Sequence, residues 1–216
     1  MPFTYDDWLK RIANRNDITA VLTHLTKPNQ ADLANLTEDE INIKAVDNLI
    51  KILKDKKLNG SNTQIGFIVG STPAVCFQDT PFYSLMQNIE YEKRIRQGNP
   101  NGKIRYCGVG VAFNKFYIFT KGGRPVLYEK TEIAKKILDK NEHWRIVNHQ
   151  LDIENPNIID WTHEREWRVP QCLEFDIENT CVILYNKKCV KYFSENCPKE
   201  ISQNLDVIIN LKAFIM

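Results

Sequence analysis

The chain has 216 residues, a length at which one compact domain is the usual arrangement. Hydrophobic residues make up 43% and charged residues 26%, close to the averages for globular proteins, so the composition argues against a disordered chain. The formal net charge of +2 is too small to indicate nucleic acid or a membrane surface as a partner.

The cysteine spacing and the apolar segments indicate the compartment. None of the six cysteines forms a CxxC pair, which argues against a zinc hairpin. The N-terminal segment lacks the apolar core of a signal peptide, and no stretch approaches the roughly 20 apolar residues that span a bilayer. We therefore expect reduced, mostly buried cysteines in a cytoplasmic protein that does not contact a membrane.

The chain is expected to begin with a helix and a strand. Residues 4–14 predict a short helix with Thr4 as its N-cap. Residues 17–26 are rich in β-branched side chains, which predicts a strand ending near His24. The stretch 27–44 is polar, and we interpret it as a surface insertion, although it contains a capping-box pattern.

The clearest helix in the sequence is predicted over residues 44–60. Its apolar side chains recur at the spacing of one helix face, at Val46, Leu49, Ile50 and Leu53. The short apolar runs 65–70 and 74–78 predict strands, and 79–97 predicts a second long helix that begins after a turn.

The middle of the chain predicts a hairpin followed by a helix. Residues 104–119 are interpreted as two strands that join at Asn114 and Lys115. A glycine turn and a short strand are expected in 121–130. Residues 129–140 predict an amphipathic helix that carries Ile133, Ile137 and Leu138 on one side.

The rest of the chain is interpreted as mostly strand, in segments 144–151, 165–170, 180–186, 188–193 and 206–216. Helices and strands do not alternate regularly, which favours an α+β fold over a doubly wound sheet. No linker or internal repeat is visible, so we expect a single domain over residues 1–216.

The usual signatures of nucleotide-binding folds, zinc proteases and serine hydrolases do not occur in the sequence. Polar clusters inside apolar strands remain as candidate sites. One is 23–26, where His24 and Thr26 end the first predicted strand; a single His on a strand is more often structural than catalytic. Another is Arg124, which follows two glycines and precedes a proline. Such an Arg is able to hold a phosphate bidentately, and the alternative is an exposed turn residue.

The densest cluster is 160–170, with two Trp, two Glu, two Arg and one His. Strand alternation places Thr162, Glu164, Glu166 and Arg168 on one face. A solvated edge strand with weak Glu–Arg pairs is the structural alternative. Aromatic and charged residues at this density favour a ligand site. A separate aromatic group, Phe77, Phe82 and Tyr83, is interpreted as core, with a stacking surface for a planar ring as the alternative.

The order of these clusters resembles that of DarT-type DNA ADP-ribosyltransferases over residues 20–175. The matching pieces are Thr23-His24, Asn48-Leu49 with Ile52-Leu53, the Phe77 to Tyr83 segment, and Glu166-Trp167-Arg168-Val169. The segments VCFQDTP, GGRPVLY and DWTHEREWR are similar to proteins grouped with AbiGi-type abortive phage resistance.

The resemblance implies the split, twisted β-sheet of ADP-ribosyltransferases with flanking helices, and NAD as the substrate. It implies these roles: His24 and Thr26 at the nicotinamide-side ribose, Phe77, Phe82 or Tyr83 against nicotinamide, Arg124 at the pyrophosphate, and Glu166 as the catalytic residue with Glu164 as the second choice. A fixed carboxylate stabilises the positive charge that develops on the ribose when the nicotinamide bond breaks.

Three functions remain open from the sequence. The first is an NAD-dependent ADP-ribosyltransferase of anti-phage defence, acting on a nucleic-acid or protein acceptor. The second is a non-catalytic antitoxin or sensor that binds a cognate partner in a defence system. The third is a nuclease that holds Mg²⁺ between Asp79, Glu164 and Glu166.

Overall fold

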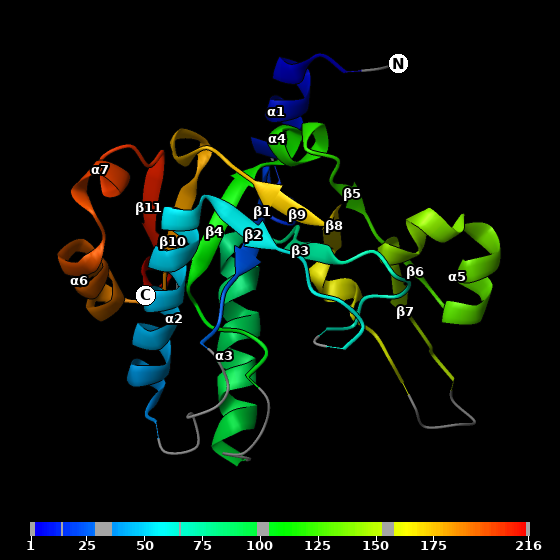
Figure 1. Ribbon diagram of the computed structural model, residues 1–216, viewed down its shortest axis with the longest axis horizontal. Helices are drawn as coiled ribbons and strands as arrows, with labels where there is room; N and C mark the ends of the chain where they lie inside the picture. The colour runs from blue at the N-terminus through cyan, green and yellow to red at the C-terminus, as the bar shows by residue number, and fades with distance from the viewer. Residues whose placement is uncertain are drawn as a thin grey trace. The chain divides into compact units, whose positions relative to one another are not determined.

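Figure 1 shows the computed structural model of the protein, which describes residues 3–13, 15–28, 36–64, 66–98, 104–152 and 158–214. The fold is mixed α+β with flanking helices, as the sequence predicts, and its central sheet is mostly antiparallel. The strand order of this sheet is β11-β10-β4-β1-β3-β8-β5. Among the described residues, no helix combines the length and the apolar composition needed to cross a bilayer.

The chain divides into two compact units, each assembled from three separate segments. The first unit comprises residues 1–22, 57–80 and 114–174. The second comprises residues 23–56, 81–113 and 175–216. β1 (Val21–Leu25) contains residues of both units.

The first unit contains an antiparallel set of strands and several short helices. Its helical elements are α1 (Tyr5–Ala13), α4 (Lys115–Thr120), α5 (Thr131–Ile137) and the 3-10 turns η2 (Lys140–Arg145) and η3 (Thr162–Glu164). Its strands are β2 (Lys57–Asn59), β3 (Ala74–Gln78), β5 (Arg124–Pro125), β6 (Leu127–Glu129), β7 (Ile146–Asn148), β8 (Glu166–Pro170) and β9 (Cys172–Glu174). β8 pairs antiparallel with β3 on one side and β5 on the other. β6 and β7 pair in parallel, and α5 packs against them (Figure 1).

The second unit contains the long helices. Its elements are α2 (Glu38–Asp55), α3 (Phe82–Gly98), β4 (Gly110–Asn114), η4 (Ile177–Asn179), β10 (Cys181–Leu184), α6 (Lys187–Asn196), α7 (Lys199–Ser202), β11 (Val207–Asn210) and η5 (Leu211–Phe214). β10 pairs antiparallel with β4 and parallel with β11. α2 packs against α6 (Figure 1). α3 packs against η5. Leu49 and Leu53 of α2, together with Phe193 of α6, are fully buried.

Several predicted elements are confirmed. α1 begins after Thr4, whose hydroxyl accepts a hydrogen bond from the Asp7 backbone N–H at 3.2 Å. The four apolar side chains predicted to share one face of the helix over 44–60 are all buried in α2. The predicted end of that helix is wrong, because α2 ends at Asp55 and Lys57–Asn59 form β2. β1, β3 and α3 also form where the sequence predicts them.

The prediction for 27–44 is wrong at its C-terminal end, because α2 starts at Glu38. Thr37 and Glu40 form both hydrogen bonds of a capping box, and this fixes the first turn of the helix. Residues 29–35 of the predicted insertion lie outside the described residues.

The predicted hairpin over 104–119 is also wrong, since α4 follows β4 directly. The Asn114 side chain accepts a hydrogen bond from the Phe116 N–H at 2.9 Å and so caps a helix instead of a turn. Residues 188–193, predicted as strand, lie in α6, where Cys189 and Phe193 are buried one helical turn apart. The described part of 65–70 is not a strand.

The amphipathic interpretation of α5 is only partly confirmed. The helix forms, and Ala134 is its buried residue. Ile133 and Ile137 are 44% and 62% exposed, so the predicted apolar side is not buried.

Candidate functional site

The centre of the candidate site is an ion pair on β8 in the first unit. Arg168 Nε donates to Glu166 Oε1 at 2.8 Å, and Arg168 Nη2 donates to Glu166 Oε2 at 3.2 Å. The two residues share one face of the strand, as alternation predicts. They are only 6% and 3% exposed, and β8 lies between two other strands, so the alternative of a solvated edge strand is wrong.

Two backbone carbonyls hold the guanidinium in place. Arg168 Nη1 donates to the carbonyl oxygens of Trp144, at 2.7 Å, and Ile146, at 3.0 Å. The Glu166 backbone N–H donates to the Tyr128 hydroxyl oxygen at 2.7 Å. Charge-assisted bonds of this kind are short and directional, so the Glu166 carboxylate has a fixed orientation.

The neighbouring strand completes a group that we name the Glu166 cluster: Glu166, Arg168, Tyr128, Cys76 and Gln78. In the β3–β8 register, Cys76 lies opposite Arg168 and Gln78 lies opposite Glu166. Desolvation raises the pKa of the Cys76 thiol well above its ordinary value, and the charge of Glu166 raises it further. Desolvation likewise raises the pKa of Tyr128. Both groups therefore keep their protons at neutral pH, which makes Cys76 a poor nucleophile.

Six buried polar atoms lack hydrogen-bond partners in the part of the chain that the structure describes, and three of them lie at the end of β3. One of the three, Asp79 Oδ1, lies 2.8 Å from Lys115 Nζ in an ion pair, which leaves two atoms without any polar partner. They are Gln78 Oε1 and Thr80 Oγ1, on residues that are 7% and 2% exposed. Such atoms are uncommon in native proteins, because each costs about 1–3 kcal/mol when it loses water without gaining a partner. They therefore mark this strand end as a candidate ligand site.

A second ion pair holds Asp79, which lies between Gln78 and Thr80 in the sequence. Lys115 Nζ lies 2.8 Å from Asp79 Oδ1 and 2.9 Å from Asp79 Oδ2. The Asp79 backbone N–H donates to the Glu164 carbonyl oxygen at 3.1 Å. Lys115 Nζ also lies 6.0 Å from the centre of the Trp167 ring.

Glu164 does not lie on the strand that the alternation predicted. It belongs to the η3 turn, and Arg165, which follows, has a left-handed backbone with φ of 45°. This residue ends the turn, so the strand begins only at Glu166. Among the described residues, no group of three or more His, Cys, Asp or Glu side chains is arranged to hold a metal ion. The carboxylate cluster of the nuclease hypothesis is thus not assembled, and Asp79 and Glu166 each pair with a cation.

Arg124 lies in β5, where it is opposite Arg168 in the strand register. The preceding turn requires a glycine at Gly122, where φ is 88°. The guanidinium carbon of Arg124 lies 4.0 Å from the centre of the Phe119 ring, and its Nη1 donates to the carbonyl oxygens of Phe119 and Gly123. Stacking and backbone bonds thus position this side chain.

Phe77 is fully buried and pairs in register with Trp167, which agrees with its interpretation as a core residue. In the first unit, the strand register places Arg124 of β5 on the same face of the sheet as Glu166 of β8, whereas Phe77 of β3, paired with Trp167, lies on the opposite face. Glu164 is joined to the end of β3 through its backbone.

The other four predicted site residues belong to the second unit. His24 lies in β1 and is partly exposed. Its carbonyl oxygen packs closely against Gly110, because a Cβ atom added to Gly110 would lie only 2.1 Å from that oxygen. Thr26 is buried and accepts a hydrogen bond from Asn48 Nδ2 at 2.7 Å. The Phe82 ring packs 5.8 Å from that of Phe214, and Tyr83 is 55% exposed. Their assigned roles stay predictions.

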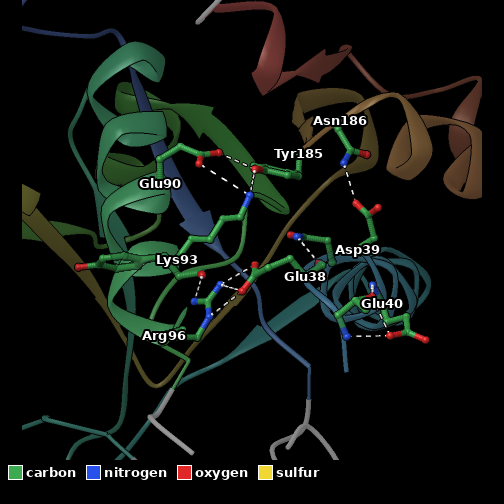
Figure 2. A network of polar contacts seen from close by, with 11 residues as sticks. Glu38, Asp39, Glu40, Glu90, Lys93, Arg96, Tyr185 and Asn186 are labelled. Carbon is green, nitrogen blue, oxygen red and sulfur yellow. Dashed lines mark hydrogen bonds and ion pairs between the residues drawn. The ribbon is translucent and has the colours of Figure 1, made fainter. Parts of the chain in front are cut away.

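The second unit also contains a polar network that the sequence reasoning missed. Figure 2 shows Glu90, Lys93 and Tyr185 pointing toward one another. The Tyr185 hydroxyl donates to Glu90 Oε1 and accepts a hydrogen bond from Lys93 Nζ at 3.3 Å. Desolvation raises the pKa of Tyr185, and the hydrogen bond to Glu90 raises it further. Tyr185 is therefore a neutral donor to this carboxylate.

Arg96 and Glu38 form the other half of this network (Figure 2). Arg96 Nη2 lies 2.8 Å from both carboxylate oxygens of Glu38, and Nη1 donates to the Tyr106 carbonyl oxygen at 3.3 Å. The pair joins the start of α2 to α3. Arg96 and Glu38 lie 58 positions apart in sequence, so no local spacing reveals the pair.

Comparisons of the chain with protein-family models, with curated proteins and with solved structures give no match. Of the polar groups described, the Glu166 cluster combines a buried, oriented carboxylate with unpartnered polar atoms beside it. It is the strongest candidate for a functional site.

Proposed function

We propose that the protein is an NAD-dependent ADP-ribosyltransferase that acts in bacterial anti-phage defence, with Glu166 as its catalytic residue. The observation that carries the proposal is the buried Glu166 carboxylate, which Arg168 fixes through both oxygens. The resemblance of residues 20–175 to DarT-type and AbiGi-type proteins supplies the reaction class. An ADP-ribosyltransferase-like split sheet is part of this proposal.

The fixed carboxylate suits the chemistry of this reaction. The bond between ribose C1′ and the nicotinamide nitrogen breaks, its electron pair leaves with nicotinamide, and positive charge develops on the ribose. A preorganised negative charge stabilises that state, because the site needs no reorganisation when the charge appears. A carboxylate offers about four lone-pair sites, so Arg168 leaves others able to accept a ribose hydroxyl.

The same group is suited to the transfer step. The acceptor nucleophile forms a new bond to C1′ and loses its proton, which a carboxylate within hydrogen-bond reach accepts as a general base. Arg124, oriented by Phe119 and two carbonyls, supplies a cation for the pyrophosphate of NAD. Glu164 is the second choice of catalytic carboxylate. The roles that the resemblance implies for His24, Thr26, Phe82 and Tyr83 of the second unit stay predictions.

A binding protein without turnover is the second candidate, such as the antitoxin or sensor of a defence system. One observation favours it. Glu166 and Arg168 neutralise each other, as the two members of a purely structural ion pair do. In that case the cluster binds a nucleotide or a partner and breaks no bond.

Transfer of label from adenylate-labelled NAD to a cell lysate tests the proposal. The purified protein is compared with Glu166→Gln and with Glu178→Gln, which makes the same chemical change at an exposed position. We expect labelled acceptor with the wild type and Glu178→Gln, and a loss on the order of 10²–10³ in rate with Glu166→Gln. Nuclease and protease digestion of the product then identifies the acceptor class.

Equal labelling by Glu166→Gln and the wild type would remove Glu166 from the reaction. No labelling and no nicotinamide release by a folded wild-type protein, together with measurable NAD binding, would establish the binding protein instead. Circular dichroism of each variant separates loss of activity from loss of fold.

A further inference from the structure

The central sheet has two edge strands, and their compositions differ. One edge is β5, a strand of only two residues, Arg124 and Pro125, and a charged residue and a proline are typical of protected sheet edges. The other edge is β11, which pairs only with β10 among the described strands. β11 contains no charged residue and no proline, and Val207 and Ile208 are 43% and 41% exposed. An apolar edge of this kind favours pairing with a further strand.

The residues that flank β11 carry opposite charges, and these charges indicate what the edge pairs with. Asp206 precedes the strand and Lys212 follows it, and both are exposed. When two copies of β11 lie antiparallel, Asp206 of each copy comes to the end where Lys212 of the other copy lies. Parallel copies would instead bring like charges together, which is unfavourable. The charges therefore favour a second copy of this chain, related to the first by a twofold axis.

Both charges are available for such a contact. Asp206 Oδ2 accepts a hydrogen bond from Cys181 Sγ at 3.3 Å, and a thiol is a weak donor. Lys212 Nζ lies 5.3 Å from the centre of the Tyr185 ring. Neither the thiol nor the ring neutralises the charge that it contacts.

We infer that β11 is the interface of a homodimer, in which it pairs antiparallel with β11 of a second copy. The two seven-stranded sheets then join into one, and main-chain hydrogen bonds between the two edges supply affinity. The exposed side chains of Val207 and Ile208 pack against those of the other copy, which removes apolar area from water. A twofold pair uses the same surface on both copies, so the assembly closes at two chains. This inference is independent of the proposed function.

Sedimentation velocity of the full chain over a range of concentrations tests the inference. We expect a species with twice the 25.2 kDa mass of the chain, in a fraction that rises with concentration. Ile208→Lys places two like charges close together across the interface, so it should raise the dissociation constant of the dimer by about tenfold or more. Ile137→Lys is the matched control. Ile137 is 62% exposed in α5, and its replacement should leave the dissociation constant unchanged.

Charge reversal tests the antiparallel orientation separately. Asp206→Lys alone and Lys212→Asp alone each bring like charges together in the dimer, so each should weaken it. The double variant Asp206→Lys with Lys212→Asp restores opposite charges at both ends and should restore the dimer. Local damage to the fold would add up in the double variant and would not be rescued. Circular dichroism of each variant confirms that the chain is folded.

Three results would overturn the inference. A wild type that stays monomeric at every concentration would show that a second copy does not cover this edge. A dimer that Ile208→Lys leaves intact would place the interface elsewhere on the chain. A double charge reversal that dimerises no better than the single variants would reject the antiparallel pairing.

Discussion

At the scale of single residues, the Glu166–Arg168 pair decides how the first unit is interpreted. The pair lies on β8, which has a neighbouring strand on each side. Desolvation lowers the pKa of Arg168, but Glu166 and Cys76 together raise it by more, so the pKa of Arg168 lies above its ordinary value. Taking both charges out of water is costly, and the pair is tolerated because each charge faces the other at 2.8 Å.

Removal of one partner should therefore be far more damaging than removal of both. Arg168→Met leaves a buried carboxylate without a counter-ion, and we expect a loss of about 3–5 kcal/mol in the free energy of unfolding. The double variant Glu166→Leu with Arg168→Met should recover much of this loss. Denaturant unfolding at neutral pH measures both values.

The exposed pair between Lys188 and Asp39 is the control for this comparison. Its side chains are 73% and 45% exposed, so Lys188→Met should change stability little. If the double variant at Glu166 and Arg168 were as unstable as Arg168→Met alone, the pair would owe its effect to packing and not to charge.

The buried thiol of Cys107 makes stability depend on alkaline pH. Desolvation raises its pKa from 9.0 to about 12, whereas in the unfolded chain the thiol titrates near its ordinary value. Its contribution to stability is fully present below pH 9.0 and is lost as the pH rises toward 12. Urea unfolding at several values above pH 9 should show falling stability, and Cys107→Ala should reduce the slope. An identical slope in that variant would contradict the assignment.

At the scale of elements, side-chain caps indicate where α2 and α4 begin, and composition does not. The capping box at Thr37 and Glu40 is visible in the sequence and forms in the structure, although we had interpreted the stretch around it as an insertion. The segment after Asn114 has strand-like composition but forms α4, because the Asn114 side chain caps a helix. Composition alone does not distinguish a strand from a helix here, because the Asn114 cap outweighs the β-propensity of the aromatic residues that follow it.

Thr37→Ala should weaken the start of α2. The substitution removes the side-chain acceptor for the Glu40 N–H and one half of the capping box. We expect a loss of about 1 kcal/mol in the free energy of unfolding, and a smaller loss for Thr37→Ser, which keeps the hydroxyl. Thermal unfolding of both variants checks this, and equal losses would contradict a capping role.

At the scale of the whole molecule, contacts between distant parts of the chain were not visible in the sequence. Charge density drew attention to Glu166, and alternation placed Arg168 on the same face. The other hydrogen-bond partners of these two residues are Tyr128, Trp144 and Ile146, which lie 22 to 38 positions away in the sequence. The Tyr185 network joins residues more than 90 positions apart, and no motif marks it.

The interleaved units predict how fragments of the chain behave. Each unit is built from three separate segments, so a cut at residue 113 removes parts of both. We expect fragments 1–113 and 114–216 to be unfolded when each is expressed alone, with poorly dispersed NMR spectra. A well-dispersed spectrum of either fragment would show that one set of segments folds without the rest.

The central claim is that Glu166 breaks the bond between ribose and nicotinamide in NAD. Its most direct test is the rate of nicotinamide release by the purified protein, measured for the wild type, Glu166→Gln and the exposed control Glu178→Gln. We predict release by the wild type and the control, and a rate on the order of 10²–10³ lower for a folded Glu166→Gln. Equal rates in all three proteins, or no release by a folded wild type, would contradict the claim.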